Sequence, residues 1–197
     1  EMIPGPLLRL REGQEAILRV TNHLDEDTSI HWHGLLVPAD MDGVPGFSYD
    51  GIKPGETFTY RFNVRQAGTY WYHSHSGGQE QQGMYAPLVI DPAEDDPVRY
   101  DREHTIVLSD WTDEDPMDVL RNLKGNGAYY NYGKRTLPGF VSGLFDDAGA
   151  TVRDRTSWGG MRMDPTDIAD VTGATYSYLL NGKVPADNWP GLFQDGE

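Results

Sequence analysis

The sequence carries two pairs of histidines with the same spacing, His31 with His33 and His73 with His75. Residues i and i+2 point in different directions on a helix, but they lie on one face of a β-strand. Both pairs occur in runs typical of strands, so each pair is expected to present two imidazoles side by side. Neutral imidazole is a ligand for copper, zinc, iron and nickel. If the two strands are neighbours, the four imidazoles converge and form a metal site.

The residues around these pairs favour redox chemistry over hydrolysis. Three neutral histidines and one water would suit a zinc hydrolase, but neither pair encloses an Asp or Glu that could act as its general base. Paired copper ions that bind dioxygen need many imidazoles and few other ligands. The two remaining histidines, His23 and His104, lie at no ligand-like spacing from another histidine. They are expected to be surface or hydrogen-bonding residues.

Composition excludes several classes of function. The 197 residues include 16 Lys and Arg and 31 Asp and Glu, so the formal charge is −15. Such a surface repels nucleic acid and anionic lipid. No apolar run is long enough to span a bilayer, and no signal-peptide pattern follows Glu1. Because the sequence has 0 cysteines, it contains no disulfide, thiolate nucleophile, iron–sulfur cluster or blue-copper centre of its own.

Short strands between turns must position the histidines. The sequence has 23 Gly and 13 Pro, and residues 57–62 alternate with a period of two, as in a half-buried strand. Strands are expected at residues 16–20, 30–37, 57–64, 69–75, 88–90 and 105–108. Closely spaced strands with Gly and Pro turns favour an all-β sandwich or barrel.

The character of the sequence changes after about residue 91, where acidic residues dominate. A helix is predicted after Asp115, which can cap it, with Pro116 in its first turn and Gly125 at its end. A second short helix is predicted at residues 164–171. Residues 129–163 have no firm period and receive no assignment.

Three motifs lie in the first half of the chain: His-Trp-His-Gly at residues 31–34, Asp-Met-Asp-Gly-Val-Pro-Gly at 40–46 and Gly-Thr-Tyr-Trp-Tyr-His-Ser-His-Ser at 68–76. Together they resemble the first cupredoxin domain of the multicopper oxidases. Residues 3–6 also resemble the start of that family. Further segments are similar to its bacterial copper-resistance branch: residues 109–112, 158–167 and 178–183. The resemblance covers nearly the whole chain. It implies a cupredoxin-like Greek-key β-sandwich with a partly helical, irregular C-terminal extension.

The resemblance also implies a role for each histidine of the two pairs. In this family a type 2 copper and two type 3 coppers form a trinuclear cluster, whose ligands come from the first and last domains. His31 resembles the type 2 ligand, His33 and His73 resemble ligands of one type 3 copper, and His75 resembles a ligand of the other. Asp42 matches an acid that assists proton delivery during oxygen reduction, although it is equally well explained as a turn former.

The resemblance divides the chain into three segments. Residues 1–112 are expected to form the first cupredoxin domain, with its first strand missing, and residues 113–175 an irregular, partly helical connection. Residues 176–197 resemble the start of a second cupredoxin domain. The last domain of the family, with its blue copper, is absent, so the chain is interpreted as a piece of a larger oxidase. Three aromatic residues beside the histidines are expected in the core: Trp32, Trp71 and Tyr72.

The implied function is to supply half the ligands of the copper cluster of a periplasmic oxidase. That oxidase would couple the oxidation of phenols, or of metal ions such as Cu(I), to the reduction of dioxygen to water, with a role in copper resistance. Its partners would be the C-terminal cupredoxin domain of the same parent protein, dioxygen and the phenolic or metal-ion substrate. This chain alone is expected to be inactive.

Two other functions remain open from the residues. One is a non-catalytic module that sequesters copper through the same four histidines. The other is a cupin-type mononuclear zinc or iron enzyme, a class that also places His-x-His on a strand. A cupin would normally need a further Glu and His downstream, and His104 is the only later histidine.

Overall fold

The computed structural model is built mainly from short strands, with few helices. It describes residues 2–96, 98–127, 129–130, 136–160 and 176–192. The chain divides into two compact units. The first comprises Glu1–Trp111 with Tyr178–Glu197, and the second comprises Thr112–Ser177. Both histidine pairs belong to the first unit.

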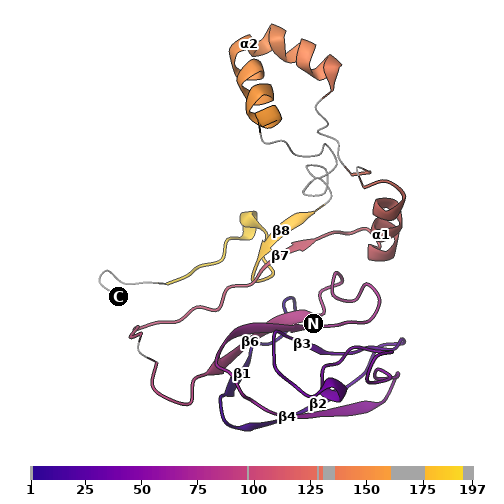
Figure 1. Ribbon diagram of the computed structural model, residues 1–197, viewed down its shortest axis with the longest axis vertical. Coiled ribbons are helices and arrows are strands. Elements are labelled where there is room, and N and C mark those ends of the chain that lie inside the picture. Colours follow the sequence, from indigo (N-terminus) through magenta and orange to yellow (C-terminus); the bar gives the residue numbers. More distant parts are fainter. Residues whose placement is uncertain (1, 97, 128, 131–135, 161–175, 193–197) are drawn as a thin grey trace. The chain divides into compact units, whose positions relative to one another are not determined.

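The first unit contains a four-stranded sheet and a two-stranded sheet that lie as two layers (Figure 1). The four-stranded sheet has the order β1-β6-β5-β3, formed by Leu8–Arg11, Tyr85–Asp91, Gly68–His73 and His31–His33. The two-stranded sheet pairs β2, Glu15–Thr21, with β4, Thr57–Asn63. Strands β1 and β6 run parallel, whereas the other pairs in these two sheets are antiparallel.

The hydrophobic core lies between these layers because alternate residues of each strand point inward. In β4, Tyr60 and Phe62 are buried while their neighbours are exposed. Trp32 of β3 is 1% exposed and packs edge-on against Tyr60, with ring centroids 5.2 Å apart. The buried cluster consists of Ala16, Ile30, Trp32, Ile52, Tyr60, Phe62, Val64, Leu88 and Ile90. These two packed sheets confirm the predicted all-β class.

Some strand boundaries differ from the sequence-based prediction. The strand predicted at residues 30–37 is present only as His31–His33, because Gly34 adopts a left-handed conformation with φ of +82°. Strand β1 was not predicted, since four residues give too short a pattern to separate from a turn.

The strand predicted at residues 105–108 begins later than expected. It is β7, Leu108–Trp111, which pairs with β8, Ser177–Leu180. The preceding backbone bonds to the side chain of Asn181 instead of to a strand. The Val107 N–H donates to Oδ1 of Asn181 at 2.8 Å, and Nδ2 of Asn181 donates to the Thr105 carbonyl at 3.2 Å.

The second unit contains helices α1, Pro116–Gly125, and α2, Leu137–Gly160. Helix α1 confirms the prediction, since the Asp115 carboxylate accepts the backbone N–H groups of Met117 and Asp118 at 2.8 and 3.2 Å. Helix α2 occupies residues that received no assignment, and it is interrupted at Asp147, where φ is −152°.

Short 3₁₀ helices span Ala39–Met41 (η1) and Pro185–Asp187 (η3). The helix predicted at residues 164–171 lies outside the described residues. The three-segment division at residues 112 and 175 stays a prediction. Within the described residues, no helix combines the length and the apolar character needed to cross a bilayer.

Candidate metal centre

Strands β3 and β5 bring the two histidine pairs together. Their antiparallel register places His31 opposite His73 and His33 opposite Trp71. Because successive side chains alternate between faces, these four residues project from one face of the sheet, while Trp32 projects from the other. The burial of Trp32 confirms that it belongs to the core.

The four imidazole rings form one cluster. The ring centroid of His31 lies 5.6 Å from that of His33, 5.3 Å from that of His73 and 5.4 Å from that of His75. Nδ1 of His33 lies 3.1 Å from Nε2 of His73. The candidate ligand atoms of His31, His33 and His73 all lie within 4.8 Å of one another. The ring of His75 lies next to this group, where it contacts the rings of His31 and His73.

Hydrogen bonds at Nδ1 orient the rings of His31 and His73. Nδ1 of His31 lies 2.7 Å from the Asp42 carbonyl oxygen and 3.4 Å from the Asp42 carboxylate. Nδ1 of His73 lies 2.9 Å from the Ser74 carbonyl oxygen and 2.8 Å from the Glu80 carboxylate. Carbonyl oxygens only accept, so both rings carry their proton on Nδ1. In each ring, Nε2 therefore keeps its lone pair for a metal ion.

The burial of the cluster is uneven. His73 is 6% exposed and His31 is half-buried, whereas His33 and His75 are exposed. Burial lowers the pKa of His73 below that of a free imidazole, although the Ser74 carbonyl and the Glu80 carboxylate act in the opposite direction. The neutral ring is the form that binds metal. One side of the cluster is thus anchored in the protein, and the other is open.

The position of Asp42 follows from the turn at Gly43. Gly43 has φ of +73°, and a Cβ on it would lie 1.8 Å from the Ile30 carbonyl oxygen. Only glycine permits this close approach, which brings the Asp42 backbone against the start of β3. Asp42 therefore lies beside His31, where its carbonyl oxygen is a closer contact than its carboxylate.

Two residues that contact the cluster were not predicted to do so. The expectation that Trp71 belongs to the core is wrong, because Trp71 stacks on His33 and His73 with ring centroids 4.8 and 4.2 Å apart. Its spacing from His73 could have shown this, since residues i and i+2 of a strand share a face. Glu80 gave no such signal, because it lies in a loop. The third expected core aromatic, Tyr72, is half-buried and packs against the core.

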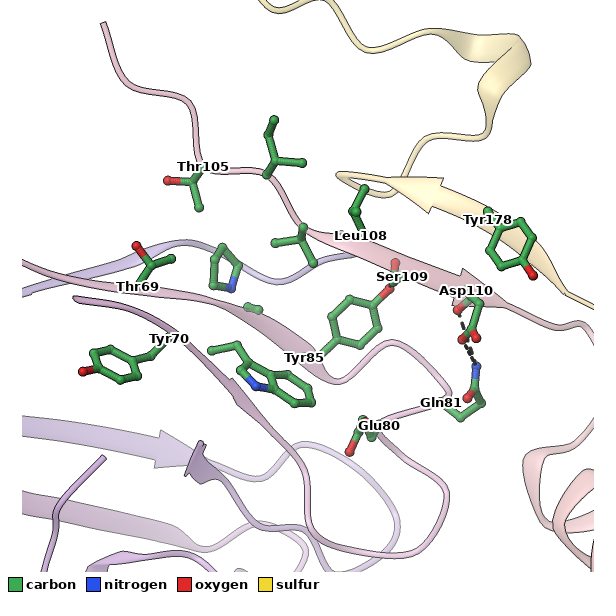
Figure 2. A pocket seen from close by; sticks show the side chains of 15 residues that line it. Thr69, Tyr70, Glu80, Gln81, Tyr85, Thr105, Leu108, Ser109, Asp110 and Tyr178 are labelled. Atoms are coloured by element: carbon green, nitrogen blue, oxygen red, sulfur yellow. Dashed lines mark hydrogen bonds between the residues drawn. The ribbon is translucent and has the colours of Figure 1, made fainter. Parts of the chain in front are cut away.

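A pocket of about 630 Å³ adjoins the cluster and is lined by Trp71 and Glu80. Figure 2 shows Glu80 and Gln81 at its edge, with the Gln81 amide directed at Asp110. Across the pocket, the Tyr85 hydroxyl donates to the Ser109 hydroxyl at 2.7 Å. Because Trp71 and Glu80 both contact His73, the pocket lies next to the buried side of the histidine cluster.

Comparisons with known proteins show which family this chain is related to. Residues 1–95 match a family model described as multicopper oxidase. The chain is 58% identical to copper resistance protein A of Pseudomonas syringae pv. tomato, in a match that covers 99% of this chain and 32% of that protein. It is 54% identical to copper resistance protein A of Escherichia coli, with coverage of 99% and 32%. The chain thus spans about a third of the length of these relatives.

A solved structure shows the same fold. The crystal structure of Fet3p, described as a multicopper oxidase that functions in iron import, superposes with a TM-score of 0.56 at 36% sequence identity. The superposition covers 64% of this chain and 25% of Fet3p. The predicted cupredoxin-like β-sandwich is confirmed by this match.

Proposed function

Because the chain belongs to the multicopper oxidase family, we propose that it supplies half the ligands of a trinuclear copper cluster. His31 would bind the type 2 copper, His33 and His73 one type 3 copper, and His75 the other. The observation that carries this proposal is the 3.1 Å separation between Nδ1 of His33 and Nε2 of His73. Two nitrogens bound to one ion at about 2 Å lie roughly 3 Å apart at tetrahedral angles.

The residues present fit copper. The group of candidate ligands consists of three imidazoles, with a fourth imidazole adjoining it. When bound, copper supplies one-electron transfer to dioxygen in this family. The protein itself holds the rings: the carbonyl oxygens of Asp42 and Ser74 accept the Nδ1 protons, and Trp71 covers the faces of His33 and His73. This arrangement keeps two Nε2 atoms available and restricts the tilt of the rings.

The exposed side of the cluster is where we propose that the remaining ligands bind. They would come from the C-terminal cupredoxin domain of the same parent protein, facing His33 and His75. The length of the relatives, about three times that of this chain, supports this arrangement. The assembled oxidase would reduce dioxygen while it oxidises phenols or metal ions such as Cu(I). The names of the relatives favour a role in copper resistance, and we propose a periplasmic location.

A cupin-type mononuclear site is less consistent with the described residues. The candidate ligand group among them contains imidazoles and no carboxylate. His104, the only histidine downstream of the two pairs, lies elsewhere, with its ring against Trp189 at 5.6 Å and Nε2 against the Leu192 carbonyl.

The chain alone is expected to bind Cu(II) without acting as an oxidase. Its sequence contains 0 cysteines, so no thiolate can accept electrons from a substrate or give the intense blue absorption of a copper–thiolate bond. The copper-loaded chain should oxidise phenols no faster than the same concentration of free Cu(II). Absorption spectra and oxygen-electrode traces check both points. Oxygen consumption well above the free-copper control would contradict the proposal.

Replacing Asp42 by alanine is expected to change the Cu(II) affinity of the chain by less than about threefold. The closer acceptor for Nδ1 of His31 is the backbone carbonyl at 2.7 Å, which the substitution retains. Titration against a competing chelator measures the affinity, and a loss above about tenfold, typical of a lost ring-orienting partner, would assign that role to the carboxylate. In the assembled oxidase, we propose that the same change slows dioxygen reduction while the copper content is preserved.

A further inference from the structure

His75 lies beyond the last residue of β5, and the backbone pairing beside it ends at the bond that the Ser74 N–H donates to the Met84 carbonyl at 2.9 Å. It is nevertheless held next to the cluster, with its ring centroid 5.4 Å from that of His31 and 6.1 Å from that of His73. Its side chain is exposed, so burial does not hold it either. The backbone around His75 must therefore be fixed by contacts outside the sheet.

Those contacts centre on the side-chain amide of Gln79, which is 4% exposed. Its Oε1 accepts from the hydroxyls of Thr28 and Ser74, each at 2.7 Å. Its Nε2 donates to the Glu26 carboxylate at 2.8 Å and to the Asp27 carbonyl at 2.9 Å. An amide side chain offers two acceptor sites and two donor hydrogens, so Gln79 uses its full capacity.

Three serines connect this network to the backbone of His75: Ser29, Ser74 and Ser76. The His75 N–H donates to the Ser29 hydroxyl at 3.0 Å, and that hydroxyl lies 2.9 Å from the Ser76 hydroxyl. The Ser76 N–H donates to the Ser74 hydroxyl at 3.0 Å, and Ser74 in turn donates to Gln79. The backbone on both sides of His75 is thus bonded to a network that ends at one buried amide.

We propose that Gln79 is a positioning residue for copper binding, because its amide ties residues 26–28 to Ser74 and so fixes the place of His75. Residues 26–28 lead into β3, which carries the first histidine pair, whereas Ser74 lies between the histidines of the second. Beyond the end of the ladder, the amide therefore joins the two ligand-bearing segments, alongside the direct bond from the His75 N–H to the Ser29 hydroxyl. The inference rests on the proposed function, in which His75 is a copper ligand.

Replacement of Gln79 by methionine tests the proposal. Methionine is similar in length, but it has no donor for Glu26 and Asp27, and its sulfur is only a weak acceptor for the two hydroxyls. The Cu(II) affinity of the chain, measured by chelator competition, should fall by about tenfold or more, as for other residues that orient metal ligands. The replacement of His75 by alanine should lower it similarly. The matched control is Gln82→Met, because Gln82 is an exposed glutamine of the same loop.

A double variant separates positioning from a general effect on stability. If Gln79 acts through His75, then Gln79→Met should cause no further loss of Cu(II) affinity in a chain that already carries His75→Ala. In each single variant, the electron paramagnetic resonance spectrum should show fewer imidazole nitrogens coupled to Cu(II) than the spectrum of the unmodified chain. Losses that add in the double variant, or a wild-type affinity for Gln79→Met, would overturn the proposal. An unchanged affinity for His75→Ala would instead count against the proposed function.

The milder variant Ser74→Ala covers the case in which Gln79→Met does not fold. It removes one hydrogen bond to the amide and the bond that the Ser76 N–H donates to Ser74, and it leaves the Ser74 carbonyl at His73 in place. The Cu(II) affinity should then fall by about threefold, and only in chains that keep His75. A wild-type affinity for Ser74→Ala, in a chain whose circular dichroism is unchanged, would also overturn the proposal.

Discussion

Replacing both His33 and His73 by alanine is expected to lower the Cu(II) affinity of the chain by at least about a hundredfold. These residues supply two of the three imidazoles whose ligand atoms lie within 4.8 Å of one another, and their facing nitrogens are only 3.1 Å apart. Loss of a group that merely orients a ligand already costs about 10- to 100-fold, so loss of two ligands should cost at least as much.

The matched control for this variant replaces His23 and His104 by alanine, which removes the same number of imidazoles from other parts of the chain. The control should bind Cu(II) as the unmodified chain does. Chelator competition measures all three proteins under the same conditions. Equal losses in the two double variants would show that copper binds to surface histidines in general and not to the cluster.

Replacing Gly43 by alanine is expected to destabilise the chain more than any other glycine substitution near the site. The added Cβ would lie 1.8 Å from the Ile30 carbonyl oxygen and 2.5 Å from its carbon, so the backbone itself must move. We expect a loss of about 4 kcal/mol or more in the free energy of unfolding, in the range typical of severe steric conflict. Because the Asp42 carbonyl would move away from Nδ1 of His31, the Cu(II) affinity should fall as well.

Gly46 provides the control for this substitution. It has φ of +78°, close to that of Gly43, but nothing lies within 4 Å of a Cβ built on it. Gly46→Ala should therefore cost only the strain of a left-handed alanine, about 1–2 kcal/mol. Urea unfolding of both variants measures the difference. Equal losses would mean that the close approach to Ile30 relaxes without cost.

The spacing of the histidines was sufficient to predict that His31 and His33 share a face, but His75 lies beyond the end of β5, where the alternation of a strand no longer applies. The spacing could not show which strands are neighbours, because pairing between β3 and β5 depends on contacts distant in the sequence. The alternation of side chains along a strand would also have placed Trp71 correctly, because Trp71 lies two residues before His73 and therefore shares its face. The length of β3 was overestimated because an apolar run after Gly34 has a strand-like composition but follows a left-handed turn.

Sequence patterns could not identify the residues that orient the ligands. Glu80 and Gln79 lie in a loop whose path is set by contacts with residues 26–29, about 50 positions earlier in the chain. The periodicity of neighbouring residues gives no information about contacts so distant in the sequence. Helix α2 was missed for a different reason, since its glycines and its break at Asp147 remove the regular apolar spacing that marks a helix.

Anomalous diffraction at the copper absorption edge, from crystals of the copper-loaded chain, locates the metal directly. We expect copper peaks bordered by ring nitrogens of His31, His33 and His73 at about 2 Å, the usual length of an imidazole–metal bond, with the ring of His75 adjoining them. Copper peaks found only at other histidines or at surface carboxylates, with the four rings left without metal, would contradict the assignment of this cluster as the copper site.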